Sequence, residues 1–155
     1  MIINGREIEF RGKSIENGKW IYSSAIANGA IKRKRDNKYM LQEELSTDYH
    51  DEWVEVIPET VGQFTGMKDV SGGKIFVDDV VKYSRVHYSL VGLEHWSKGV
   101  GLVIYDNFQS RHVLVPIGSG YEQSLCTDHK SGESTKLIGN VTDNPELLEA
   151  ENASK

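Results

Sequence analysis

The chain has 155 residues, of which 38% are hydrophobic and 26% charged, and its formal net charge is −5. This length and composition predict a soluble globular protein that needs neither disulfides nor a structural metal to fold. The single cysteine, Cys126, excludes an intramolecular disulfide framework, and the charged N-terminus and the lack of a run of ~20 apolar residues argue against a signal peptide and a membrane helix. We therefore expect a cytoplasmic protein.

The first forty residues predict a meander of β-strands. Ile8 and Phe10 alternate with charged residues, as the side chains of a half-buried strand do. Asn-Gly pairs at 17–18 and 28–29 then separate runs that are rich in aromatic and β-branched residues. Both residues of such a pair tolerate the positive φ of a type I′ turn, so each pair is expected to close a hairpin.

Residues 40–52 (MLQEELSTDYHDE) carry the weakest pattern. Met40, Leu41 and Leu45 have a helical spacing, and Gln, Glu and Leu favour helices, but an isolated helix of this length is marginal. We expect a helical turn or an irregular acidic loop. With the meander it would form an N-terminal extension over residues 1–52.

The central stretch, residues 53–83, contains two β-rich runs joined by a Gly-rich connection. The first run ends at Pro58, which lacks the N–H that a strand donates, and the tripeptide PET is expected to make one tight turn. The second run, residues 75–83, is interrupted by Asp78 and Asp79. Two adjacent acids inside a strand-like run predict a bulge or a tight corner, where one carboxylate accepts backbone N–H groups.

The second half of the chain predicts further strands separated by loops. Residues 84–99 are expected to be a loop-rich excursion and residues 118–135 a long polar loop, while GVGLVIYDN and SRHVLVPI between them are two apolar β runs. Residues 136–141 predict a last strand. DNPELLEA predicts a short C-terminal helix, capped by Asn144 or the aspartate before it, and residues 151–155 are expected to be frayed.

Short strands at close spacing, Gly-rich turns and little helix indicate a mostly β, barrel-like fold. A division near residues 40–52, with a meander followed by a small barrel, is possible. One compact domain over residues 1–150 is favoured.

No catalytic constellation stands out, and we predict no catalytic residues, no metal and no cofactor. Cys126 and His129 have a spacing that can share a metal, but one cysteine without a second ligand pair favours an ordinary polar loop. The groups His50-Asp51-Glu52 and Asp78-Asp79 lack the alternating ligand spacing of a calcium loop. The Gly-rich segment has no Gly-Lys-Ser/Thr sequence, which excludes a phosphate loop.

The remaining histidines, His87, His95 and His112, are scattered along the sequence and indicate no joint role. An enzyme whose site is assembled from dispersed residues, such as His112 with Asp79 and Glu59, is a minor alternative.

One basic segment suggests a nucleic-acid interface. It consists of four consecutive residues, Lys32, Arg33, Lys34 and Arg35, with Trp20 and Tyr22 upstream and Tyr39 downstream. Small β-barrels bind single strands with basic grooves and aromatic platforms. Four consecutive residues of a strand alternate between two faces, so a solvated hairpin tip or a charge-guarded edge strand is favoured instead. An acidic stretch follows the basic one. The two could be complementary within one fold or between two copies, but solvation of both stretches explains the pattern as well and is favoured.

Five pieces of the sequence resemble the YopX-like family of bacteriophage and prophage proteins. In chain order they are EFRGK, GKWIY, VIPETVGQFTGMKDVSGGKIFVDDVVKY, GLVIYDN and LIGNVTDNPELLE, and together they cover nearly the whole length. The chain departs from the family at Asp78, where the family usually has glycine. Aspartate tolerates the left-handed region better than most residues, so a corner there survives. The resemblance implies a mostly β fold with an SH3-like barrel over residues 55–142 and a phage or prophage origin, and it implies no established activity.

We therefore expect a non-enzymatic phage accessory protein of the bacterial cytoplasm that binds another protein or associates with itself as a homo-oligomer. Nucleic-acid binding through Lys32, Arg33, Lys34 and Arg35 is the alternative. No membrane partner is expected.

Overall fold

A computed structural model of the chain describes residues 2–3, 5–24, 31–33, 39–43, 52–88, 92, 94–118, 122–125 and 133–149. The strands in these ranges form antiparallel sheets, and the helical segments are short 3-10 turns, which confirms the predicted mostly β class. None of the helices in the described ranges is long and apolar enough to cross a membrane. The chain divides into two compact units, Met1–Gly66 and Met67–Lys155. The predicted single domain over residues 1–150 stays a prediction.

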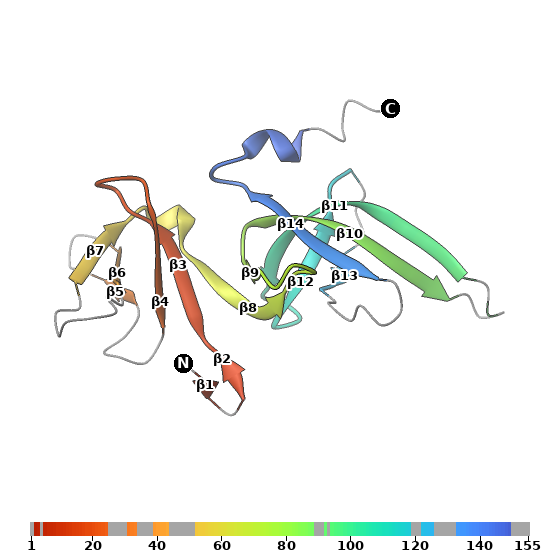
Figure 1. Ribbon diagram of the computed structural model, residues 1–155, viewed down its shortest axis with the longest axis horizontal. Helices are drawn as coiled ribbons and strands as arrows, with labels where there is room; N and C mark the ends of the chain where they lie inside the picture. The colour runs from red at the N-terminus through yellow and green to blue at the C-terminus, as the bar shows by residue number, and fades with distance from the viewer. Residues whose placement is uncertain are drawn as a thin grey trace. The chain divides into compact units, whose positions relative to one another are not determined.

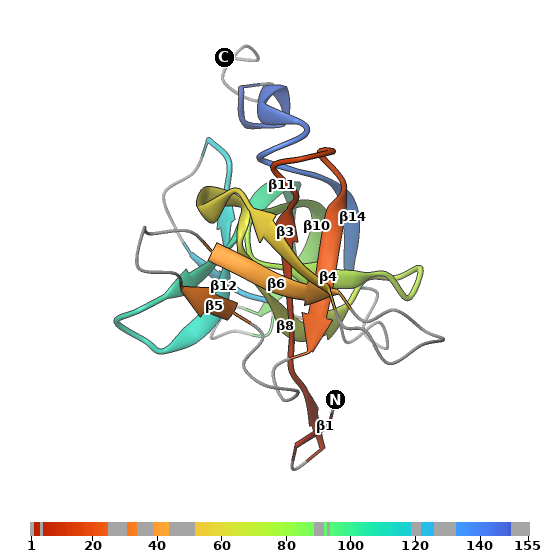
Figure 2. The ribbon, with the colours of Figure 1, turned by 90° about the vertical axis from the view of Figure 1, so that its left-hand side faces the viewer.

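The described strands of the first unit take part in three sheets, one of which continues from β8 to β9 (Figure 1). Its strands are β1 (Ile2–Ile3), β2 (Arg6–Glu7), β3 (Glu9–Lys13), β4 (Trp20–Ser24), β5 (Ile31–Arg33), β6 (Tyr39–Glu43), β7 (Glu52–Val56) and most of β8 (Gly62–Lys68), and its 3-10 turn is η1 (Pro58–Thr60). β1 pairs with β2, β3 lies between β4 and β8, and β6 lies between β5 and β7. A small core of Ile21, Leu41 and Val56 packs between these strands. Figure 2 shows the same strands after a 90° turn of the view.

The predicted hairpin at Asn17-Gly18 is present, with a different turn. β3 and β4 pair from Glu9↔Ser24 to Lys13↔Trp20. A bond of 2.8 Å from the Ser14 N–H to the Lys19 carbonyl closes a loop of four residues, and not the two-residue loop of a type I′ turn. Of the Asn-Gly pair, only Gly18 has a positive φ (69°). The second Asn-Gly pair lies outside the described residues, and the strands on either side of it, β4 and β5, belong to different sheets.

The helical expectation for residues 40–52 is wrong at its start, because Tyr39–Glu43 is strand β6. Leu41 is fully buried, and β6 has a hydrogen-bonded neighbour on each side. Pairing on both edges outweighs the modest helix propensity of this segment. Residues 44–51 lie outside the described residues. The predicted tight turn at residues 58–60 is confirmed as η1.

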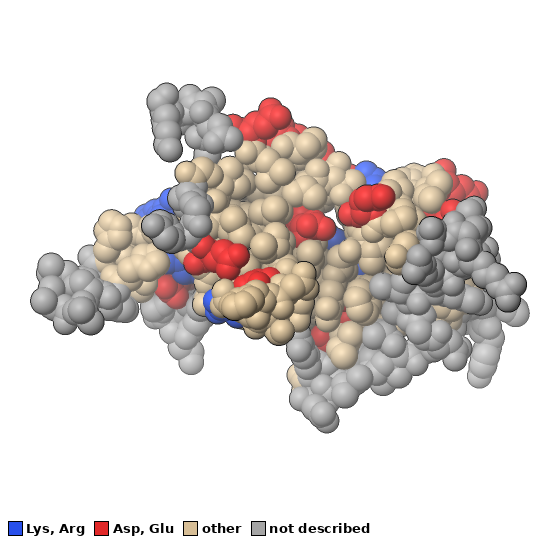
Figure 3. Space-filling view, turned by 180° about the vertical axis from the view of Figure 1, so that it is seen from behind, with Lys and Arg blue, Asp and Glu red and all other residues tan. Residues whose placement is uncertain are grey.

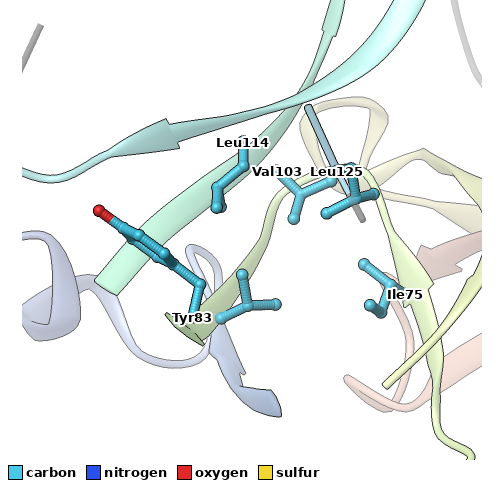
Figure 4. Close-up of a cluster of buried hydrophobic side chains, with 6 residues drawn as sticks. Ile75, Tyr83, Val103, Leu114 and Leu125 are labelled. Atoms are coloured by element: carbon cyan, nitrogen blue, oxygen red, sulfur yellow. The ribbon is translucent and has the colours of Figure 1, made fainter. Parts of the chain in front are cut away.

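The second unit is built on a five-stranded antiparallel sheet in the order β13-β12-β11-β10-β14. Its elements are β9 (Lys74–Phe76), β10 (Asp79–Tyr88), β11 (Glu94–Asp106), β12 (Arg111–Pro116), β13 (Gln123–Ser124), β14 (Ser134–Asn140) and the 3-10 turn η3 (Pro145–Leu148). One cluster of its core consists of Ile75, Val81, Tyr83, Val103, Leu114 and Leu125, of which Figure 4 labels all but Val81.

Several sequence expectations for the second half are corrected. Residues 84–99 are not a loop-rich excursion, because β10 extends to Tyr88 and β11 begins at Glu94. The far halves of both strands carry few apolar residues, so they lack the alternation by which a strand is recognised. The Gly-rich connection is likewise part strand, since β8 covers Gly62–Lys68. The C-terminal helix is the 3-10 turn η3, and the side chain of Asn144 does not cap it.

Candidate binding site

The first unit contains an open cavity of about 370 Å³, lined by the turn of the β3–β4 hairpin and by strands β6 and β7. Six of the described residues line it: Ile15, Glu16, Met40, Trp53, Val54 and Glu55. All of them belong to the first unit, so the geometry of the cavity depends on that unit alone.

Backbone hydrogen bonds fix the hairpin turn against β7. The Ile15 N–H donates to the Glu55 carbonyl at 3.0 Å, and the Ile57 N–H donates to the Lys13 carbonyl at 2.9 Å. Ser14 lies between these bonds, bridges to Val56 and is only 1% exposed. The wall made by Ile15 and Glu16 is therefore held in place by sheet-like pairing on both sides of Ser14.

The cavity has an apolar lining with two carboxylates. Ile15 is 55% exposed, which is high for a large aliphatic side chain, and Trp53 and Val54 are half-buried. Glu16 and Glu55 add negative charge, and none of the described side chains that line the cavity is basic. An aromatic ring, aliphatic groups and carboxylates together suit a ligand group with an apolar stem and a cationic head, as in the side chain of lysine or arginine.

The acid pair of the sequence forms the predicted corner. Asp78 has a φ of 69°, in the left-handed region, and the Asp79 carboxylate is fully buried and accepts the Phe76 N–H at 2.8 Å. The backbone of Asp78 is also bonded on both sides, since its N–H donates to Val103 and its carbonyl accepts from Val141. These two residues therefore terminate β9 and start β10, and the corner prediction is confirmed.

The structure describes the predicted basic segment only in part. Lys32 and Arg33 lie on β5, opposite Met40 and Tyr39 respectively, and Lys34 and Arg35 lie outside the described residues. The ring centroid of Trp20, one of the aromatic residues near the basic segment, lies 4.6 Å from the guanidinium carbon of the buried Arg11, so this ring packs on that arginine.

The residues of the dispersed enzyme site are divided between the two units, so this alternative stays a prediction. Asp79 is buried in its corner, His112 packs edge-on against Tyr105 at 5.2 Å, and Glu59 is exposed in the other unit. Of the two metal alternatives, the Cys126–His129 segment and residues His50 and Asp51 lie outside the described residues.

Sequence reasoning missed one relationship between histidines. His87 and His95 lie directly opposite each other on β10 and β11, with ring centroids 6.4 Å apart. They are therefore not scattered in space. The pair follows from the register of the β10–β11 hairpin, which the sequence does not reveal because residues 84–99 lack the alternation typical of strands.

A comparison with family models finds a match to the family described as YopX protein over residues 9–149. This span includes every residue of the cavity, both histidines of the pair and the acidic corner. A search of curated proteins finds no match.

Proposed function

The chain belongs to the YopX family, and on this premise we propose that it is a non-enzymatic binding module of a phage or prophage, acting in the bacterial cytoplasm. Its cavity would receive a lysine or arginine side chain presented by a protein partner. The observation that carries this proposal is the combination of Trp53, Met40 and two carboxylates, Glu16 and Glu55, around one open cavity.

The expected energetics are those of a modest, salt-sensitive contact. A cation over a tryptophan face contributes roughly 0.5–1 kcal/mol at an exposed site and about 2 kcal/mol when desolvated. Each exposed carboxylate adds roughly 0.2–1 kcal/mol and is screened by salt. One side chain in the cavity therefore gives specificity for a basic group, and further contacts around the cavity must supply the rest of the affinity.

Short peptides test this proposal directly. We suggest three probes of equal length, one with central lysines or arginines, one neutral and one acidic, followed by NMR chemical shifts of the protein. The proposal expects shifts at Ile15, Glu16, Met40 and Trp53 with the basic peptide only. Equal shifts with the neutral peptide, or shifts that lie elsewhere, would reject the cavity as the site.

Self-association is a special case of the same proposal, because the chain carries its own basic run at residues 32–35. A peptide of residues 30–39 distinguishes this case. If it binds at the cavity and the protein is oligomeric at low salt, the partner includes a second copy. If the protein is monomeric at all concentrations, the partner is a different protein.

Nucleic-acid binding through Lys32, Arg33, Lys34 and Arg35 stands as the competing proposal. It is supported by the basic run itself, half of which lies on β5. Against it stands the net charge of −5, and the coloured part of the face in Figure 3 shows acidic and basic side chains at separate places among neutral ones. It predicts affinity for single strands that falls steeply with salt, with a smaller slope when the four residues are replaced by alanine. No binding at low salt would reject it.

We further infer an SH3-like barrel over residues 55–142, as the family resemblance implies. The five antiparallel strands of the second unit and the register shift between Val80 and Val81 support this inference, since small barrels use bulges to curve their sheets. An experimental structure in which β10–β12 and β14 form an open, flat sheet would overturn it.

A further inference from the structure

The long hairpin of β10 and β11 places two histidines face to face. The strands pair residue by residue from Val80↔Leu102 to Tyr88↔Glu94, which sets His87 opposite His95. Directly opposed residues of an antiparallel pair have Cβ atoms about 4.5–5.5 Å apart, so their side chains share one small area of the sheet. Both histidines are exposed. We propose that His87 and His95 form a binding site for a late first-row divalent metal ion such as Ni²⁺, Cu²⁺ or Zn²⁺.

The two rings lie close to the separation that chelation of one ion requires. Imidazole nitrogen binds such metals at about 2.0–2.1 Å, and the ring centre lies roughly 1 Å behind the nitrogen, so two ligating rings have centroids at most roughly 6 Å apart. The observed separation of 6.4 Å, with 35° between the ring planes, is just beyond that limit. Both rings are exposed and rotate about χ1 and χ2 without displacing core residues, so a small rotation brings the nitrogens to one ion.

Ser97 orients one of the two ligands. Its hydroxyl oxygen lies 2.8 Å from Nε2 of His87, and it stands two residues beyond His95 on the same face of β11. In the tautomer in which Nε2–H donates to Ser97, Nδ1 of His87 carries the lone pair that a metal requires. A hydrogen bond to the second ring nitrogen is the usual way in which proteins fix a histidine ligand.

The ligand set selects the class of metal. Two neutral imidazoles without a thiolate suit copper, nickel and zinc, and the general order of stability places Cu²⁺ first. No group of three or more histidine, cysteine or acidic residues that could hold a metal is found in the described part of the chain. The pair therefore supplies two ligands, and water completes the coordination of the bound ion.

Metal titration of the full chain tests the proposal. Isothermal titration with NiCl₂ or CuCl₂ should give one ion per chain, and the Cu²⁺ form should show nitrogen coupling from two imidazoles in its electron paramagnetic resonance spectrum. His87→Ala and His95→Ala should each weaken binding by at least about tenfold, because each leaves a single ligand. Both side chains are exposed, and circular dichroism of each variant confirms that it folds.

Two controls separate this site from other ligands of the chain. His112→Gln and Cys126→Ser should leave the affinity unchanged, whereas Ser97→Ala should weaken it by a smaller factor than loss of either histidine. Full binding by His87→Ala or by His95→Ala would overturn the proposal. So would a loss of binding in Cys126→Ser, which would place the ion at the cysteine.

Discussion

The carboxylate of Asp69 accepts a hydrogen bond of 3.1 Å from the backbone N–H of Leu137, which is 68 positions further along the chain. The same carboxylate accepts the N–H groups of Ser71 and Gly73 at 2.8 Å each. One side chain thereby closes the turn after β8 and joins it to β14. Asp69 is 8% exposed, so the loss of any of these bonds would leave a backbone donor with reduced access to water.

The pH dependence of stability should reflect this arrangement. Burial acts to raise the pKa of Asp69, but the hydrogen bonds from Leu137, Gly73 and Ser71 and the nearby charge of Lys136 outweigh it, so its pKa lies below the ordinary value of 3.8. A lowered pKa in the folded state contributes stability that is fully present above the unfolded value, about 3.9. We expect this contribution to be lost as the pH falls from about 4 through the lowered pKa.

Asp69→Asn measures that contribution. The one oxygen of asparagine can still accept the N–H groups of Ser71 and Gly73. Its NH₂ group cannot accept the N–H of Leu137, so that bond is lost. The free energy of unfolding at pH 7 should therefore fall by about 1–3 kcal/mol. Urea unfolding between pH 3 and 7 should show a shallower acid slope for the variant than for the native chain. Equal slopes would show that the carboxylate of Asp69 is not held in its charged form.

The corner at residues 78 and 79 makes a second prediction. Because Asp78 has a positive φ, Asp78→Gly removes backbone strain while increasing the freedom of the unfolded chain, and the two effects should nearly cancel, within about 0.5 kcal/mol. Asp78→Val places a β-branched residue in the left-handed region and should cost about 1–3 kcal/mol. Thermal unfolding of the two variants compares them. Equal melting temperatures for glycine and valine would contradict the assigned backbone geometry.

Packing in the second unit is tight at Gly101. A methyl group added there would lie 2.5 Å from Cδ1 of Leu114, so Gly101→Ala should destabilise the protein by about 1–3 kcal/mol. Leu114 is fully buried, and Leu114→Ala alone should cost about 2–5 kcal/mol.

The double variant supplies the control for this prediction. Removal of the leucine side chain makes room for the methyl group, so the two changes together should cost less than the sum of the single changes. Strict additivity in urea unfolding would mean that Gly101 and Leu114 are not in contact.

Local features of this fold were predictable from the sequence, and features that depend on pairing were not. The corner at Asp78 and the turn after Pro58 are determined by backbone preferences of a few adjacent residues, and both were predicted. Strand β6 was not, because Leu41 and its neighbours become a strand only by pairing with β5 and β7. A segment whose own propensity is weak takes the structure that its partners provide.

Neither of the two candidate sites was predictable from the sequence, and the reason is the same for both. The cavity combines Ile15 and Glu16 with Met40 and with residues 53–55, and these come together only when the hairpin turn docks on β7. The pair of His87 and His95 depends on the register of a hairpin whose outer half carries few apolar residues. The sequence contains the side chains of both sites, but pairing between distant strands decides which of them meet.

The most direct test of the proposed function compares two carboxylate variants in the first unit. Glu16→Gln removes a charge from the cavity, and Glu59→Gln makes the same change at an exposed position of η1 outside the lining. In titrations with the basic peptide at low salt, we predict that Glu16→Gln weakens binding by roughly two- to fivefold and that Glu59→Gln leaves it unchanged. Equal affinities for both variants and the native chain, or an equal loss in both, would contradict a cationic group bound in this cavity.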